Sequence, residues 1–227
     1  MSTPASCSPR VAVVTPFCNE PADWLAQAQR SIAAQTYPCD HIMVGDAATV
    51  VPPLPAMVVN LPTCVADFGD TPRAVGSFYA VGLGYDAIAY LDADNWFDPE
   101  HIASLVTLYL QTNAAVVTSR RAFVRIDGSY MAECTASDGD SFSDTNCLFI
   151  TRAGSECCRD GPLWIGRFTP LTTGSSGTRS NNRGTRSRIP GVQASPIERG
   201  CRISIQILVK LLLWRQRRSR SKQSWPL

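Results

Sequence analysis

Short apolar runs typical of strands alternate with apolar residues at helical spacing throughout the first 150 residues. The helical spacing is clearest at 102–110, where apolar residues recur at i, i+3, i+4, i+7 and i+8 after a helix start at Asp98-Pro99. Continuous apolar strands joined by helices form mostly parallel sheets covered on both faces, so the pattern predicts an α/β fold. The expected segments are strands at 11–14, 42–44, 57–59, 87–91, 114–118 and 146–150, helices at 24–36, 73–83 and 98–110, and a hairpin at 122–132.

Charge divides the chain into two parts. Residues 1–150 carry six Arg, no Lys and sixteen acidic side chains, a net charge of −10, whereas residues 151–227 carry fifteen Lys or Arg and three acids, a net charge of +12. The apolar fraction of 44% is ordinary for a globular chain and excludes wholesale disorder. We therefore expect one folded domain over residues 1–157 and a basic, low-complexity, largely irregular tail over 158–227.

Two aspartates follow the strand expected at 87–91. Asp92 and Asp94 are two residues apart, so both side chains project to the same face where the strand ends. Parallel α/β sheets bind ligands at the carboxyl ends of their strands, and paired carboxylates there suit Mg²⁺ or Mn²⁺, which also binds substrate phosphates. The alternative is a pair of solvated loop aspartates, which the apolar strand before them and the helix start after them make less favourable.

Two longer segments resemble the family 2 glycosyltransferases, which have the GT-A fold. The first is VAVVTPFCNEPADWLAQAQRSIAAQTYPCDHIMVGDAAT at 11–49, which has the family's strand, P-x-x-N-E-like turn, helix ending in Q-T-Y-P, and strand ending near an acid. The second is PRAVGSFYAVGLGYDAIAYLDADNWFDPEHI at 72–102, which resembles the family's A-R-N-x-G segment followed by its D-x-D strand. Several motifs occur in the family's order over about 150 residues.

The resemblance implies contacts between a nucleotide and four residues of this chain. Thr15 and Asp46 would lie at the nucleotide base, with Asp46 accepting a hydrogen bond from a uracil-like ring. Arg73 matches the arginine of A-R-N-x-G and would approach the nucleotide, although Ala74 replaces the asparagine. Asp92 would face the ribose or the pyrophosphate. The alternatives are a turn-forming Asp46 and a solvated Arg73.

Sugar transfer needs both a stabilised leaving group and a base. The resemblance implies that Asp94, with Asp92, binds Mg²⁺ or Mn²⁺, which offsets the charge on the departing nucleoside diphosphate. Inverting members use a carboxylate beyond the D-x-D motif to deprotonate the acceptor hydroxyl. The motif that usually carries this acid does not occur here, and Asp144 is only a weak candidate for it.

The resemblance ends near Cys158. Residues 172–188 contain only Thr, Gly, Ser, Arg and Asn, and seventeen positions without an apolar side chain cannot build a core. A disordered basic tail and a second module are two interpretations; without interleaved aromatics, nucleic-acid binding is not expected. A shifted reading frame is the third and favoured one, because 171–184 then reads NDRVLWNAIKQQG with suitable synonymous codons. That string has the acid, arginine and amphipathic helix expected on the acceptor side.

The remaining features concern location. No run approaches the roughly 18 apolar residues of a membrane span, and the first ten residues have no apolar signal-peptide core. Nine cysteines without a C-x-x-C pair indicate reduced thiols, so we expect a cytoplasmic chain without a transmembrane segment.

These observations lead to one favoured function and two alternatives. We expect a metal-dependent, inverting glycosyltransferase that takes a nucleoside-diphosphate sugar, of the uridine type, and an unknown acceptor, and that turns over poorly because its base is missing. One alternative is a nucleotide-sugar-binding remnant without catalysis. The other is a sugar-phosphate nucleotidyltransferase, which the lack of a Gly-rich basic loop after the first strand disfavours.

Overall fold

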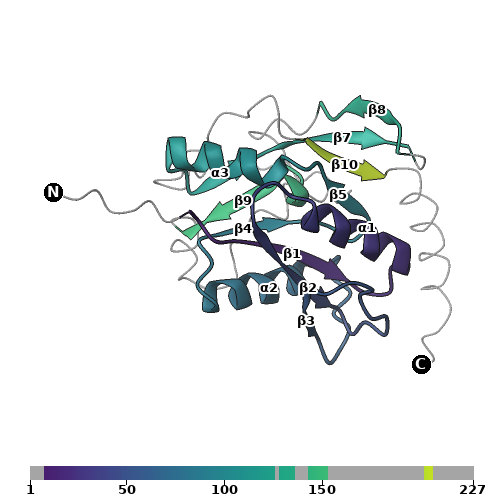
Figure 1. The fold of residues 1–227 in the computed structure, drawn as a ribbon. Helices are drawn as coiled ribbons and strands as arrows, with labels where there is room; N and C mark the ends of the chain where they lie inside the picture. Colours follow the sequence, from purple (N-terminus) through teal and green to yellow (C-terminus); the bar gives the residue numbers. More distant parts are fainter. Residues whose placement is uncertain (1–7, 126–127, 136–142, 153–201, 207–227) are drawn as a thin grey trace, which may run out of the picture.

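The computed structural model describes residues 8–125, 128–135, 143–152 and 202–206, which form two sheets, three α-helices and a 3-10 turn at Thr145–Cys147 (Figure 1). The larger sheet has the strand order β3-β2-β1-β4-β9-β6. Strands β1 to β4 are parallel to one another, whereas β9 is antiparallel to both β4 and β6. The bounds are β1 Val11–Phe17, β2 Cys39–Gly45, β3 Met57–Asn60, β4 Ala87–Tyr90, β6 Val116–Thr118 and β9 Leu148–Thr151.

Helices cover both faces of this sheet, as the sequence predicts. Helix α2 (Asp70–Gly82) lies on one face, and α1 (Ala22–Ala33) and α3 (His101–Thr112) lie on the other (Figure 1). The alternation along β1 shows the two-sided burial directly. Val11 and Val13 belong to the core that includes residues of α1 and α3, whereas Val14 belongs to the core that includes α2. The mostly parallel α/β sheet with helices on both faces is therefore confirmed.

A smaller sheet has the order β5-β10-β7-β8. The hairpin predicted from the sequence is present as β7 (Arg120–Val124) and β8 (Tyr130–Glu133), which are antiparallel. Strand β10 (Arg202–Gln206) pairs with β7 and with β5 (Asn95–Phe97), so this short piece of the expected tail is extended and paired. The rest of the expected tail, including the stretch interpreted as frameshifted, lies outside the described residues.

Several element boundaries differ from the sequence prediction, and the differences in β1 and α3 have a clear physical reason. Strand β1 continues through Pro16, although a proline cannot donate to a sheet ladder. The nitrogen of Pro16 lies on the side of β4, where pairing with β1 stops at Val14, so no ladder bond is lost. Helix α3 begins at His101 instead of Asp98, because the intervening residues form a turn in which the His101 N–H donates to the Asp98 carbonyl at 3.0 Å. Within the described part of the chain, none of the helices is long and apolar enough to span a membrane.

Candidate functional site

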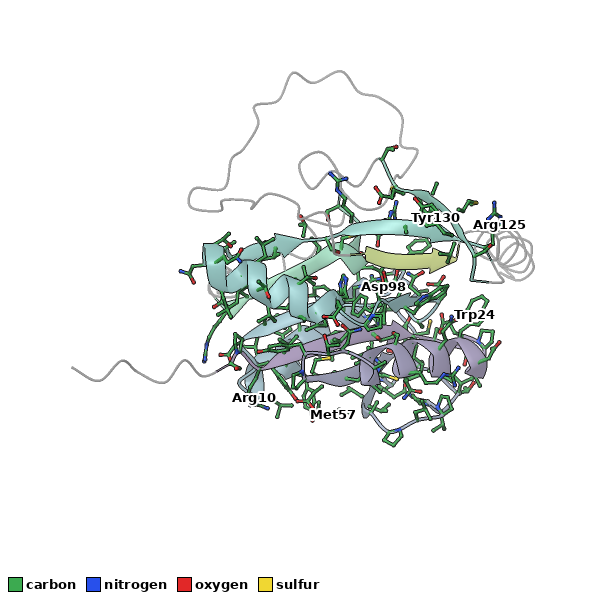
Figure 2. All side chains as sticks on the ribbon, turned by 45° about the horizontal axis from the view of Figure 1, so that its top comes forward. Arg10, Trp24, Met57, Asp98, Arg125 and Tyr130 are labelled. Carbon is green, nitrogen blue, oxygen red and sulfur yellow. The ribbon has the colours of Figure 1, made fainter. Side chains whose placement is uncertain are left out.

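The predicted site residues follow the ends of parallel strands. Asp46 follows β2 and Asp92 follows β4, and because both strands run parallel to β1, these residues lie at the same edge of the sheet. In Figure 2, Arg10 marks the opposite edge, just before β1, and Trp24 of α1 lies toward the carboxyl edge. Parallel α/β sheets bind ligands at this carboxyl edge.

An ion pair joins Arg73 and Asp92 at this edge. The Arg73 Nη2 donates to Asp92 Oδ1, and the two side chains are only 8% and 22% exposed. The Arg73 Nη1 also donates to the Phe68 carbonyl at 3.1 Å and to Asp70 Oδ1 at 3.4 Å. Burial alone would lower the pKa of Arg73, but Asp92, Asp70 and Asp144 raise it, so the guanidinium stays charged. The pair therefore joins a buried guanidinium to a partly buried carboxylate in one fixed arrangement.

The backbone before α2 determines where Arg73 lies. Gly69 precedes the helix with φ +87°, a conformation that favours glycine, and α2 begins at Asp70. A Cβ at Gly69 would lie 3.0 Å from Pro16 Cβ and 3.3 Å from Arg73 Nη1. Glycine at 69 thus lets the loop approach β1 closely enough for Arg73, in the first turn of α2, to reach Asp92.

Asp46 holds the same loop from the other side. Its Oδ1 accepts from the Val65 N–H at 2.7 Å, and its Oδ2 accepts from the Ala66 N–H at 2.9 Å and the Cys64 thiol at 3.4 Å. Burial alone would raise the pKa of Asp46, but these donors lower it below the usual aspartate value. Asp46 is 7% exposed and ionised, and it anchors residues 64–66 to the sheet edge. Its predicted hydrogen bond to a uracil-like ring stays a prediction.

Thr15 lies inside the sheet. It is fully buried, and its Oγ1 is 2.8 Å from the Nε2 atom of His41 on β2. Burial lowers the pKa of His41 to about 3, so the imidazole is neutral. The buried Thr15 hydroxyl therefore contacts the partly buried His41, and the predicted role of Thr15 at the base stays a prediction.

Asn146 is a site residue that the sequence analysis missed. It is 1% exposed, and its Nδ2 donates to Asp92 Oδ2 at 2.9 Å and to Asp144 Oδ1 at 2.5 Å. Asp144 in turn forms an ion pair with Arg121 of β7. The structure thus places the weak base candidate Asp144 one side chain away from Asp92. The only sequence signal was a polar residue at the start of the apolar run 146–150.

Asp94 is half-buried and lies in the short turn between β4 and β5. In the described part of the chain, no three His, Cys, Asp or Glu side chains gather into a ready metal site. A divalent ion at this edge would take carboxylate oxygens from the chain and its other ligands from phosphates and water, which is the usual mode for Mg²⁺. The carboxylate oxygens of Asp92 and Asp94 fit that mode.

A separate hollow of about 380 Å³ lies beyond the end of β1 and beside β3. Its lining is mostly apolar and includes neither Arg73 nor the paired aspartates, so it differs from the polar edge described above. Its residues include Phe17, Ala48, Val50, Val51, Val58 and Asn60.

Comparisons with known proteins identify the fold. No family model and no curated protein matches the chain. Two solved structures of a TarS fragment from S. aureus, one in complex with UDP and one in complex with UDP-GlcNAc, are similar to it. Each has a TM-score of 0.50 and 15% sequence identity over 65% of this chain, and the match covers 48% and 47% of the fragment, respectively. The chain therefore spans about half the length of that fragment. The fold is of the GT-A type.

Proposed function

We propose that this chain binds a uridine-diphosphate sugar at the carboxyl edge of its larger sheet and belongs to a metal-dependent, inverting glycosyltransferase of family 2. The observation that carries the proposal is the Arg73–Asp92 ion pair, which the 64–69 loop connects to Asp46. The GT-A fold of a protein solved with UDP and UDP-GlcNAc supports it. Membership of family 2 rests on the sequence motifs.

In this proposal, each residue at the edge has a separate task. Arg73 supplies a fixed positive charge that favours a diphosphate, and Asp92 accepts hydrogen bonds from the ribose. Asp94, with Asp92, would hold Mg²⁺ or Mn²⁺, which would offset the negative charge on the departing nucleoside diphosphate. Asp46 keeps the 64–66 backbone in place beside the base through its two backbone hydrogen bonds.

The environment of Asp144 favours a second candidate function, nucleotide-sugar binding without efficient transfer. Its Oδ2 is paired with Arg121, and its Oδ1 accepts from the backbone N–H and the side-chain amide of Asn146. Both carboxylate oxygens of Asp144 are therefore already engaged by donors of this chain, which leaves the carboxylate poorly placed to receive an acceptor hydroxyl. Asp144 is therefore a poor replacement for the missing acceptor-side acid.

Calorimetry with UDP and Mn²⁺ tests the proposed binding. We expect the wild-type chain to bind UDP only when Mn²⁺ is present, and Asp94→Ala to lose at least tenfold in affinity. Glu100→Ala is the matched control, since Glu100 is an exposed acid just before α3 whose carboxylate accepts from Thr36 at 2.9 Å. Equal binding by wild type and Asp94→Ala, or binding that ignores Mn²⁺, would refute the metal site.

Release of sugar from UDP-GlcNAc, followed in the same samples, separates the two candidate functions. A chain that binds UDP but neither hydrolyses the donor nor transfers its sugar is a nucleotide-sugar binder. A chain with turnover at ordinary enzyme rates is a transferase, and the interpretation that its base is missing is then wrong.

A further inference from the structure

We infer that Asn146 is a positioning residue that fixes the Asp92 carboxylate for nucleotide binding and separates it from Asp144. This inference rests on the proposed function, because Asp92 is the group through which Asn146 would act. Asn146 lies in the 3-10 turn Thr145–Cys147 that leads into β9, 54 residues beyond Asp92, and the two residues meet because β9 pairs with β4.

The contacts of Asn146 use both ends of its amide. The Oδ1 atom accepts from the Asp92 N–H at 2.5 Å, while Nδ2 donates to Asp92 Oδ2 at 2.9 Å and to Asp144 Oδ1 at 2.5 Å. A side-chain amide has one acceptor oxygen and two N–H donors, so this arrangement uses all of its groups. No other uncharged side chain of this size offers two donors and an acceptor together.

Two elements therefore hold the Asp92 carboxylate from opposite sides. Arg73 of α2 donates to Oδ1, and Asn146 donates to Oδ2. Rotation of the carboxylate about its Cβ–Cγ bond would break both contacts, so the orientation of its lone pairs is fixed before a ligand arrives. Fixed polar groups bind a ligand at a lower cost in conformational entropy than mobile ones.

The amide also separates two like charges. Asp92 is balanced by Arg73, and Asp144 is balanced by Arg121, with the neutral Asn146 between the two ion pairs. A third carboxylate at 146 would repel both neighbours in a buried place, and an apolar side chain would leave the Asp92 N–H and Oδ2 without these partners. Asn146 thus also links Asp144, which is paired with Arg121 of the smaller sheet, to Asp92 at the carboxyl edge of the larger sheet.

A double-mutant cycle tests the inference through UDP affinity. We expect Asn146→Leu, which has nearly the same size, to weaken UDP binding in the presence of Mn²⁺ by at least tenfold. In an Asp92→Asn background, the same substitution should change UDP affinity by less than twofold, because the carboxylate that it positions is already gone. Asn146→Ser keeps a single hydroxyl in place of the amide and should fall between wild type and Asn146→Leu.

Gln35→Ala is the control for a purely structural effect. The Gln35 amide donates to the Ser31 and Asp98 carbonyls and accepts from the Ile102 N–H, so it also loses three contacts, but near the end of α1 and away from the site. Gln35→Ala should lower the free energy of unfolding measured in urea without changing UDP affinity.

Each outcome bears on one claim. If wild type binds UDP and Asn146→Leu binds equally well, or loses equally in both backgrounds, Asn146 does not act through Asp92 and the inference is wrong while the proposed function stands. If Asn146→Leu does not fold, Asn146→Ser decides by the same comparison. If wild type itself does not bind UDP, the proposed function fails, and the inference fails with it.

Discussion

Gly76 of α2 lies directly against Val14 of β1. A Cβ placed on Gly76 would be 2.5 Å from Val14 Cγ1 and 3.0 Å from Val44 Cγ2 on β2. The helix therefore sits closer to the sheet than any side chain at this position would permit. This close approach matters for the site because Arg73 is one turn earlier on the same helix and reaches over the sheet edge to Asp92.

Gly76→Ala should consequently lower the free energy of unfolding by about 1–3 kcal/mol, because the methyl group forces the helix and the strand apart. Gly82→Ala at the end of the same helix is the matched control, since a Cβ there meets nothing within 4 Å. The control should be neutral or should stabilise by up to about 1 kcal/mol. Urea unfolding followed by circular dichroism measures both, and equal effects would contradict the close approach.

Removing the Arg73 side chain should destabilise the protein. Arg73→Met removes the donor from Asp92 Oδ1 and from the Phe68 carbonyl, and breaking a buried ion pair by removing one partner typically costs about 3–5 kcal/mol. Because Asp92 is 22% exposed, we expect the lower end of that range. Arg73→Lys should recover only part of the loss. A single ammonium cannot reproduce the two guanidinium nitrogens that donate separately to Asp92 Oδ1 and to the Phe68 carbonyl. Equal unfolding free energies for Lys and Arg at 73 would show that only the charge matters.

His41 should make the protein sensitive to acid. Its pKa falls to about 3 in the folded state, below the unfolded value of about 6.5, so unfolding takes up a proton between these pH values. The stability that depends on neutral His41 is complete above pH 6.5 and is lost as the pH falls toward 3. Between these pH values, His41 should make the free energy of unfolding rise with pH by about 1.4 kcal/mol per pH unit.

His41→Gln should remove this contribution to the pH dependence of the free energy of unfolding. The measurement is the free energy of unfolding in urea from pH 7 to pH 4 for the wild type and the variant. The stability advantage of the wild type at pH 7 should narrow as the pH falls, because only the wild type has an imidazole that must stay neutral beside Thr15. Parallel curves over this range would mean that His41 does not control the acid response.

The amino-acid sequence determined the local parts of this fold. Short apolar runs and helical spacing predict segments from neighbouring residues alone, so the strands at 11–14, 42–44 and 57–59 and the helix beginning near Trp24 were found from the pattern. Alternate residues of a strand share a face, which accounts for the burial of Thr15 together with Val11 and Val13. The motifs also pointed to Arg73 and Asp92, and the structure brings these two together.

Only the tertiary structure decided the direction of β9 and the contacts around Asp92. An apolar run has the same local pattern in a parallel and an antiparallel strand, so nothing in 146–150 predicted insertion between β4 and β6. Asn146 reaches Asp92 across 54 residues of sequence, and Asp46 binds backbone N–H groups that carry no side-chain signal. Metal binding by Asp94, the identity of the base and the nature of the tail stay predictions. Local spacing encodes which face a residue takes, whereas its distant partners are set by how strands pair and helices pack.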